Sequence, residues 1–212
     1  MSKLYRVSLS SDSASLLALA CLFQLSQATV FGASSNMELK TAAQLFQKGD
    51  LVQAQQLADK AIKAEPQNAN AYALRAFLFI KSKDAKKAIE YSDKAIALDK
   101  KCVDAYLVRG LARSSLSKSG ASLTDFSEAM KLKPNYSDAY FYRALAYFSM
   151  ERKKEALTDL DKAQAIDKSD SNLAIVMVAR GTIYLFYNDF DKALSNIDSA
   201  LKIEPNNAKA LE

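Results

Sequence analysis

Four arginines recur along the chain with nearly constant spacing: Arg75, Arg109, Arg143 and Arg180. Sixteen residues after them stand, in the same order, Tyr91, Asp125, Asp159 and Asn196. A guanidinium and a carboxylate can form two parallel hydrogen bonds. The spacing therefore predicts ion pairs between Arg109 and Asp125 and between Arg143 and Asp159. We interpret these pairs as structural, because a partly buried pair between two helices is satisfied without a ligand.

Other reactive residue types are scarce in this chain. It contains no histidine, and its two cysteines, Cys21 and Cys102, lie far apart. Histidine is the commonest general base and metal ligand, and a zinc site needs several clustered ligands. We therefore expect no enzyme, no catalytic or cofactor-binding residues, no metal site and no cofactor. Cys102 is interpreted as a small, semi-buried residue at the join of two repeats.

One sequence ending recurs every 34 residues and divides the chain into repeats. It reads Ala61-Ile62-x-Ala64-Glu65-Pro66 in its first copy and ends at Glu204-Pro205 in its last. All three prolines, Pro66, Pro134 and Pro205, occupy one position of this ending, where a helix must stop. Alignment predicts five repeats, at 35–68, 69–102, 103–136, 137–170 and 174–207, with Ser171-Asn172-Leu173 as an insertion. Residues 208–212 are interpreted as the short start of a capping helix.

Each repeat is expected to form two helices that pack closely together. Large and small residues recur at spacings of three and four, which place them on one helix face. Small residues at Gly110 and Gly181 of the first helix would let the two axes approach. Asp50, Asp84 and Asp189 stand at the turn between the helices, where a carboxylate caps exposed backbone N–H groups.

This pattern resembles the tetratricopeptide repeat over about residues 35–207. The resemblance is carried by the alternating large and small residues and by the runs Ala105-Tyr106-Leu107-Val108-Arg109-Gly110 and Ala139-Tyr140-Phe141-Tyr142-Arg143-Ala144. Glu38 and Met177 depart from it at the tyrosine position. The resemblance implies an all-α fold, a right-handed α-solenoid superhelix of helix-turn-helix repeats, with the first helix of each repeat lining a concave surface.

In such a fold the concave surface is where a partner would bind. The first-helix residues that face it would be apolar: Phe77, Ile80, Leu107, Leu111, Phe141, Leu145, Phe148, Val178, Leu185 and Phe186. An exposed apolar surface of that extent predicts a partner, a protein or peptide segment with apolar side chains. The sequence equally allows tight winding that buries these residues against each other. The leading interpretation is a non-enzymatic scaffold or adaptor, and a non-catalytic subunit of an enzyme complex is an alternative.

A known ligand class of the family, the C-terminal tails of chaperones, is not expected here. In that case lysine, arginine and asparagine side chains clamp a carboxylate. The corresponding positions here hold Ala73, Phe77, Leu107 or Val108, and Asp138, which cannot hold a carboxylate.

Positive charges gather at the turns within repeats 2 to 4, although the net charge is only +5. This basic ridge consists of Lys81, Lys83, Lys86, Lys87, Lys118, Arg152, Lys153 and Lys154. Binding to a membrane surface or to nucleic acid through this ridge is an alternative function. Nucleic acid is the less expected of these two partners, because no aromatic residues alternate with the cations to stack on bases. A solvated set of turns explains the ridge equally well.

The two ends of the chain carry separate predictions. The last repeat lacks a full capping helix, so its surface around Leu194, Ile197 and Leu201 is expected to pair with a second copy or another protein. Residues 1–34 resemble an export signal, with Lys3 and Arg6 before an apolar run and a cleavage site after Ala28. Acylation at Cys21 is an alternative. We expect an exported or envelope-associated protein, with a cytoplasmic or organellar protein as the other interpretation.

Overall fold

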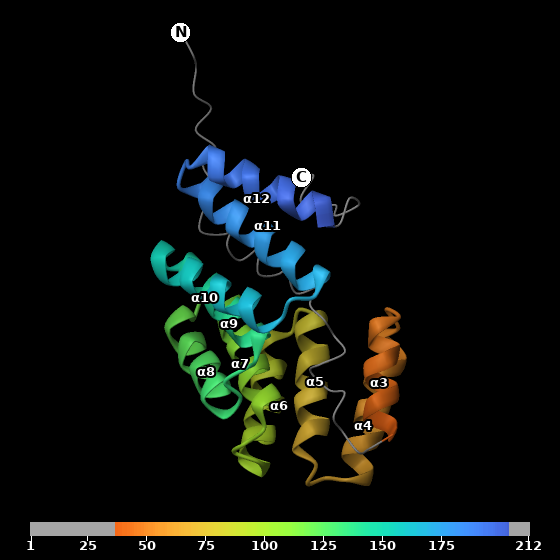
Figure 1. The fold of residues 1–212 in the computed structure, drawn as a ribbon. Helices are drawn as coiled ribbons and strands as arrows, with labels where there is room; N and C mark the ends of the chain where they lie inside the picture. Colours follow the sequence, from red (N-terminus) through yellow and green to blue (C-terminus); the bar gives the residue numbers. More distant parts are fainter. Residues whose placement is uncertain (1–36, 204–212) are drawn as a thin grey trace.

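The computed structural model describes residues 37–203 of the chain, and in that range it consists of helices without a strand (Figure 1). The helices follow one another as pairs: α3 (Met37–Gln47) with α4 (Leu51–Ala64), α5 (Ala69–Lys81) with α6 (Ala85–Leu98), α7 (Val103–Ser115) with α8 (Ser119–Leu132), α9 (Ser137–Ser149) with α10 (Lys153–Ile166), and α11 (Asp170–Phe186) with α12 (Phe190–Ile203). The predicted export signal, Cys21, Pro205 and the capping segment lie outside these residues.

The pairs stack into the predicted α-solenoid. Each helix contacts its own partner, and the second helix of one pair contacts the first helix of the next. In Figure 1 the helix axes turn progressively, from nearly vertical in α3 and α5 to strongly inclined in α11 and α12. The inserted residues 171–173 extend α11 at its N-terminus, so α11 has 17 residues where the other first helices have 11 to 13.

A left-handed residue ends the first helix in every pair. Gly49, Lys83, Ser117, Glu151 and Asn188 occupy the same repeat position, and all have φ between 57° and 84°. This conformation ends the helix with two backbone hydrogen bonds. In the second pair, Lys83 N donates to Ile80 O and Asp84 N donates to Phe79 O. Only the first pair uses glycine, the residue that adopts this conformation without steric cost.

Capping residues then start the second helices. Asp50 accepts a hydrogen bond from Gln53 N at 3.0 Å, and Asp84 accepts one from Lys87 N at 3.1 Å. The side chain of Asp189 accepts a hydrogen bond from Lys192 Nζ at 2.9 Å. At the C-terminal end of the second helices, the carbonyl of the alanine that recurs in the repeat ending accepts the last backbone hydrogen bond. In α4, Glu65 N donates to Ala61 O at 2.8 Å. The turn that follows begins the next repeat.

Candidate functional site

Arg109 contacts two carboxylates on different helices. Its Nε and Nη2 donate to Asp125 Oδ1 at 3.1 and 2.7 Å, and its Nη1 donates to Asp93 Oδ1 at 2.6 Å. Arg113 Nη1 donates to the other oxygen of Asp125 at 2.8 Å. Asp125 is 1% exposed, so two guanidinium groups neutralise a carboxylate that would otherwise be buried at high cost.

Arg143 repeats this arrangement one unit later. Its Nε and Nη2 donate to the two oxygens of Asp159 at 2.6 and 2.9 Å, and its Nη1 donates to Ser127 Oγ at 3.2 Å. The hydrogen bonds to Asp159 raise the pKa of Arg143 above its ordinary value. The structure thus brings together both arginine and aspartate pairs that the 16-residue spacing predicts.

The arginines also contact a second set of partners, on the preceding repeat, which the 16-residue spacing does not predict. Arg75 donates to both oxygens of Asp59, at 2.7 and 3.3 Å, and Arg180 donates to Asp161 at 2.5 Å. With the two partners named above, this set consists of Asp59, Asp93, Ser127 and Asp161, spaced 34 residues apart. This 34-residue spacing is the feature of the sequence from which the second set of contacts could have been predicted. The row of arginines therefore ties consecutive repeats together, which is a structural task.

Most of the ten predicted groove residues are buried in the structure. Exposed fractions of 8% or less are found for Phe77, Ile80, Leu107, Leu111, Phe141, Leu145, Phe148 and Val178. Leu185 is 42% exposed and Phe186 is partly buried. The rings of Phe148 and Phe186 meet edge to face with their centroids 5.2 Å apart. The exposed apolar part of this set is therefore its C-terminal end, on α11.

A group of polar residues gathers where first helices begin. Tyr136 Oη donates to Asp104 Oδ1 at 2.8 Å, and burial raises the pKa of Asp104 to about 6. Asp138 is 6% exposed, and burial together with the nearby Asp167 and Asp104 raises its pKa to about 7. By sequence, Asp138 is singled out only as a residue unable to hold a carboxylate. Its neighbours Asp104 and Asp167 lie outside α9, so spacing within one helix could not reveal its burial.

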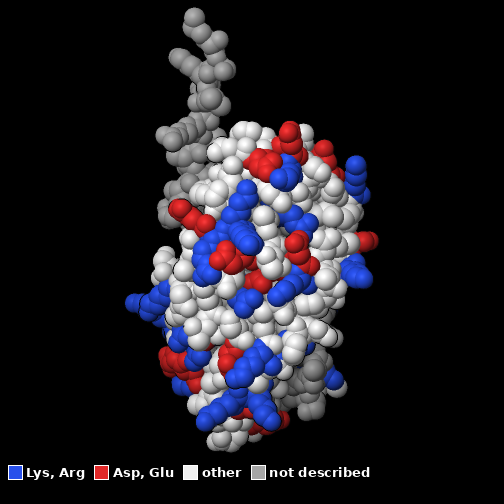
Figure 2. Space-filling model, turned by 60° about the vertical axis from the view of Figure 1, so that its left-hand side comes forward, with Lys and Arg blue, Asp and Glu red and all other residues white. Residues whose placement is uncertain are grey.

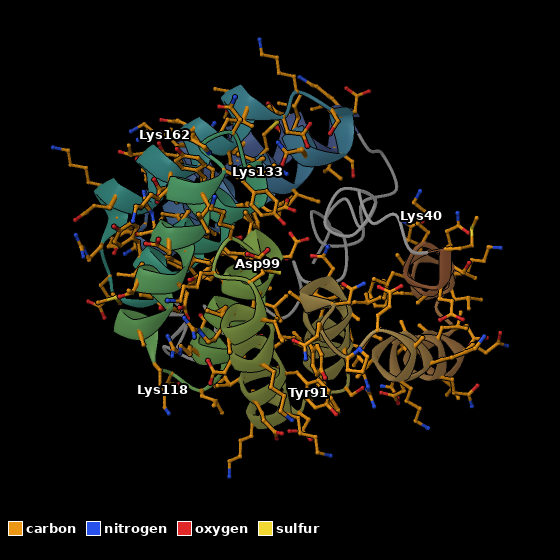
Figure 3. The ribbon with its side chains drawn as sticks, turned by 90° about the horizontal axis from the view of Figure 1, so that it is seen from below. Lys40, Tyr91, Asp99, Lys118, Lys133 and Lys162 are labelled. Atoms are coloured by element: carbon orange, nitrogen blue, oxygen red, sulfur yellow. The ribbon has the colours of Figure 1, made fainter. Side chains whose placement is uncertain are left out.

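Several cations of the basic ridge are already engaged within the chain. Lys87 Nζ lies 3.4 Å from Asp84, and Arg152 forms a 2.7 Å ion pair with Glu155. Lys153 Nζ lies 4.8 Å from the ring centroid of Tyr187. On the face shown in Figure 2, Lys and Arg side chains are interspersed with Asp and Glu. Figure 3 shows Lys118 at the periphery of the stack.

The last helix pair carries exposed apolar side chains on α12. Phe190 is 57% exposed and Leu194 is 62% exposed, while Ile197 and Leu201 are partly buried.

Cys102 is buried between repeats. Its Sγ donates to Asn70 Oδ1 at 3.6 Å, and burial raises the pKa of the thiol to about 11. Among residues 37–203, no group of His, Cys, Asp and Glu side chains is placed to hold a metal ion. None of the helices described is long and apolar enough to cross a membrane.

The comparisons with known proteins agree with this architecture. Two Tetratricopeptide repeat profiles match residues 45–113 and 107–171, while no curated protein matches the chain. The thermophilic TPR protein TTC0263 of Thermus thermophilus is 21% identical with a TM-score of 0.72, over 82% of this chain and 93% of its own. A tetratricopeptide repeat protein of Parabacteroides merdae is 19% identical with a TM-score of 0.68, over 97% and 83%. YrrB, described as a TPR protein with an unusual peptide-binding site, is 22% identical with a TM-score of 0.58, over 82% and 88%. The chain therefore belongs to the tetratricopeptide repeat family.

Proposed function

We propose that this protein is a non-enzymatic scaffold that binds an apolar segment of a partner protein on its first-helix surface. The observation that carries the proposal is the exposed side chain of Leu185, beside the partly buried Phe186 on α11. Phe186 packs edge to face against the buried ring of Phe148 on α9, which holds it in place beside Leu185. A peptide-binding site in the similarly folded YrrB is consistent with such a role.

Site-specific photo-crosslinking tests this proposal in the full chain. A benzophenone amino acid at position 185 should crosslink a partner polypeptide in cells, because the side chain would lie in the contact. The matched control is position 98, where Leu98 has a similar exposure of 37% but belongs to α6, a second helix. Equal crosslinking from both positions would contradict binding at the first-helix surface.

Self-association through the last repeat is a second candidate. It is favoured by Phe190 and Leu194, which leave two large apolar side chains exposed on α12. Sedimentation of the full chain at tens of micromolar should then show a dimer, and Leu194→Lys should return it to a monomer. A wild-type chain that sediments as a strict monomer would exclude this mode.

Export is also a proposal, which rests on the sequence of residues 1–34. N-terminal sequencing of the mature protein tests it directly. A start at Gln27 to Val30 supports cleavage near Ala28, a blocked and acylated Cys21 supports a lipoprotein, and retention of Met1 contradicts both.

A further inference from the structure

We propose that the bound segment is an amphipathic α-helix of another protein, which carries an arginine and packs against α11 and α12 as the first helix of a further repeat would. The face that it covers, here called the terminal face, consists of Leu185 on α11 and of Phe190, Leu194 and Asp198 on α12. Figure 1 shows these two helices at one end of the stack. The inference rests on the proposed function, whose site includes Leu185, and it specifies the conformation and the charge of the bound segment.

The earlier repeats show which element covers the position of Leu185. Because of the insertion, residues of repeat 5 correspond to residues 37 earlier in repeat 4, and then to residues at steps of 34. The counterparts of Leu185 therefore include Phe148 and Phe46, which are 4% and 8% exposed. Their rings meet those of Phe186 and Phe77, which belong to the first helix of the next repeat, with centroids 5.2 Å apart in both cases. An incoming first helix thus covers this position.

The apolar residues of α12 occupy positions that face the same incoming helix. The counterpart of Leu194 in repeat 1 is Gln55, whose Nε2 donates to Ser82 Oγ at 3.0 Å. Ser82 directly follows α5, the first helix of repeat 2. Phe190 lies one helical turn before Leu194 and therefore on the same side of α12. Both side chains are more than half exposed, so the terminal face presents apolar surface where earlier repeats contact the next helix.

Asp198 adds a specific charge to this face. Its counterparts in repeats 1 to 4 accept hydrogen bonds from the arginine of the next first helix, in the pairs Arg75 with Asp59, Arg109 with Asp93, Arg143 with Ser127 and Arg180 with Asp161. Asp198 itself is exposed, and no hydrogen bond or ion pair joins it to another of residues 37–203. An arginine on the bound helix would extend this row of contacts by one member.

The same contacts fix the register of the bound helix. Phe77 and Ser82 follow Arg75 by two and seven residues, and Phe186 follows Arg180 by six. Positions i and i+7 lie on one side of a helix, whereas i+2 and i+6 lie on another. Later residues of α5 contact earlier residues of α4, so the bound helix should run antiparallel to α12. We therefore expect arginine at i and apolar residues at i+2, i+6 and i+7.

A second copy of this chain matches the terminal face less well. In the described part of the chain, α3 is the one first helix that no helix pair precedes. At the position of the arginine it holds Thr41, whose Oγ1 donates to Met37 O at 2.9 Å. Its i+6 and i+7 positions hold Gln47 and Lys48. Stacking of α3 from a second copy would bring polar side chains to apolar positions and no arginine to Asp198, so the assigned occupant is another protein.

Binding of designed peptides to the full chain tests this assignment. The probe is a fluorescent helix of about 18 residues, built from alanine, glutamine and lysine, with arginine at i and leucine at i+2, i+6 and i+7. At physiological salt it should bind about two- to fivefold more tightly than the same peptide with citrulline, an uncharged isostere, at i. A peptide with its leucines moved to the opposite side should not bind. Equal anisotropy titrations for arginine and citrulline, or for the two leucine patterns, would overturn the proposal.

An exchange of charges tests the role of Asp198. Asp198→Lys should weaken binding of the arginine peptide by about fivefold and should favour a peptide with glutamate at i, because opposite charges then meet again. The matched control is Asp191→Lys on the same helix. Its counterpart Val52 is 66% exposed although a repeat follows it, so position 191 lies outside the terminal face and its variant should keep the preference for arginine. Melting curves show that both variants are folded. An unchanged preference for arginine in Asp198→Lys would overturn the proposal.

Photo-crosslinking from positions 185 and 194 separates this inference from the proposed function. Adducts from both positions that Asp198→Lys weakens would support both. An adduct from position 185 without one from position 194 would refute packing against both helices and leave the proposed function in place. No adduct from either position, together with peptide binding that depends on Asp198, would refute the proposed function alone. An adduct with the mass of two copies of this chain would overturn the assignment to another protein.

Discussion

Phe126 fills the space into which a side chain at Gly110 would point. A Cβ atom at position 110 would lie 2.6 Å from Cε1 of Phe126, and Phe126 is fully buried. The same 16-residue relationship joins Gly181 to Ile197, where a Cβ would lie 2.9 Å from Cγ1. Glycine on α7 and α11 thus compensates for a large residue on the partner helix, which keeps the two helices close.

Gly110→Ala should destabilise the protein although alanine is the better helix former. The new methyl group cannot be accommodated without moving the buried Phe126 ring, and overpacking costs about 1–3 kcal/mol. Gly120→Ala is the matched control, because nothing lies within 4 Å of its added Cβ. It should stabilise α8 by up to about 1 kcal/mol. Urea unfolding of both variants checks the prediction, and the same sign of change in both would refute it.

Lys83→Gly should raise the free energy of unfolding by about 0.5–1 kcal/mol. Lys83 has φ of 60° and is exposed, and glycine removes the steric cost of that conformation. The control is Lys86→Gly, which places glycine within α6 and should lower stability by about 1 kcal/mol. Thermal melting of the two variants measures the difference. A loss of stability in Lys83→Gly would contradict the left-handed turn.

Asp125→Ala and Asp93→Ala should differ strongly although both remove a partner of Arg109. Asp125 is buried, so its loss strands two guanidinium groups and should cost about 3–5 kcal/mol. The side chain of Asp93 is 52% exposed, so its loss should cost less than about 1 kcal/mol. Chemical denaturation measures both values. Comparable losses would show that burial does not set the strength of these contacts.

Asn196→Asp should stabilise the last repeat by about 1 kcal/mol. Arg180 Nε is buried without a hydrogen-bond partner, whereas the matching atoms of Arg109 and Arg143 donate to aspartates. Position 196 corresponds to those aspartates, and a carboxylate there could accept from Nε. Asn196→Ser, which offers no carboxylate, is the control. A melting temperature that rises equally in both variants would refute the explanation.

Stability should fall as the pH rises from about 4 to about 7. Burial raises the pKa of Asp138 from 3.8 to about 7 and that of Asp104 to about 6. The folded state therefore holds protons that the unfolded chain releases in this window, and each group lowers stability by at most about 1.4 kcal/mol per pH unit. Asp138→Asn should flatten the dependence between pH 6 and 7. An unchanged pH profile in this variant would contradict the shifted pKa.

Contacts within one repeat could be predicted because they depend on local spacing. The 34-residue period and the change between large and small residues indicate paired helices, and a 16-residue interval connects Arg109 to Asp125 and Arg143 to Asp159. These relationships hold for any two antiparallel helices joined by a short turn. The contacts of Arg109 with Asp93 and of Arg180 with Asp161 cross between repeats, so they depend also on how one pair rotates against the next.

The amino-acid pattern thus specifies the helical repeat and its internal pairs, since helix periodicity is a local property of the backbone. Stacking determines which apolar side chains reach solvent. Phe141 has a helix pair on either side and is fully buried, whereas Leu185 belongs to the last pair among residues 37–203 and is 42% exposed. Asp138 is likewise an ordinary first-turn aspartate by sequence. Its burial comes from the packing of neighbouring repeats around it, because solvent access depends on all the surrounding helices and not on the spacing within one.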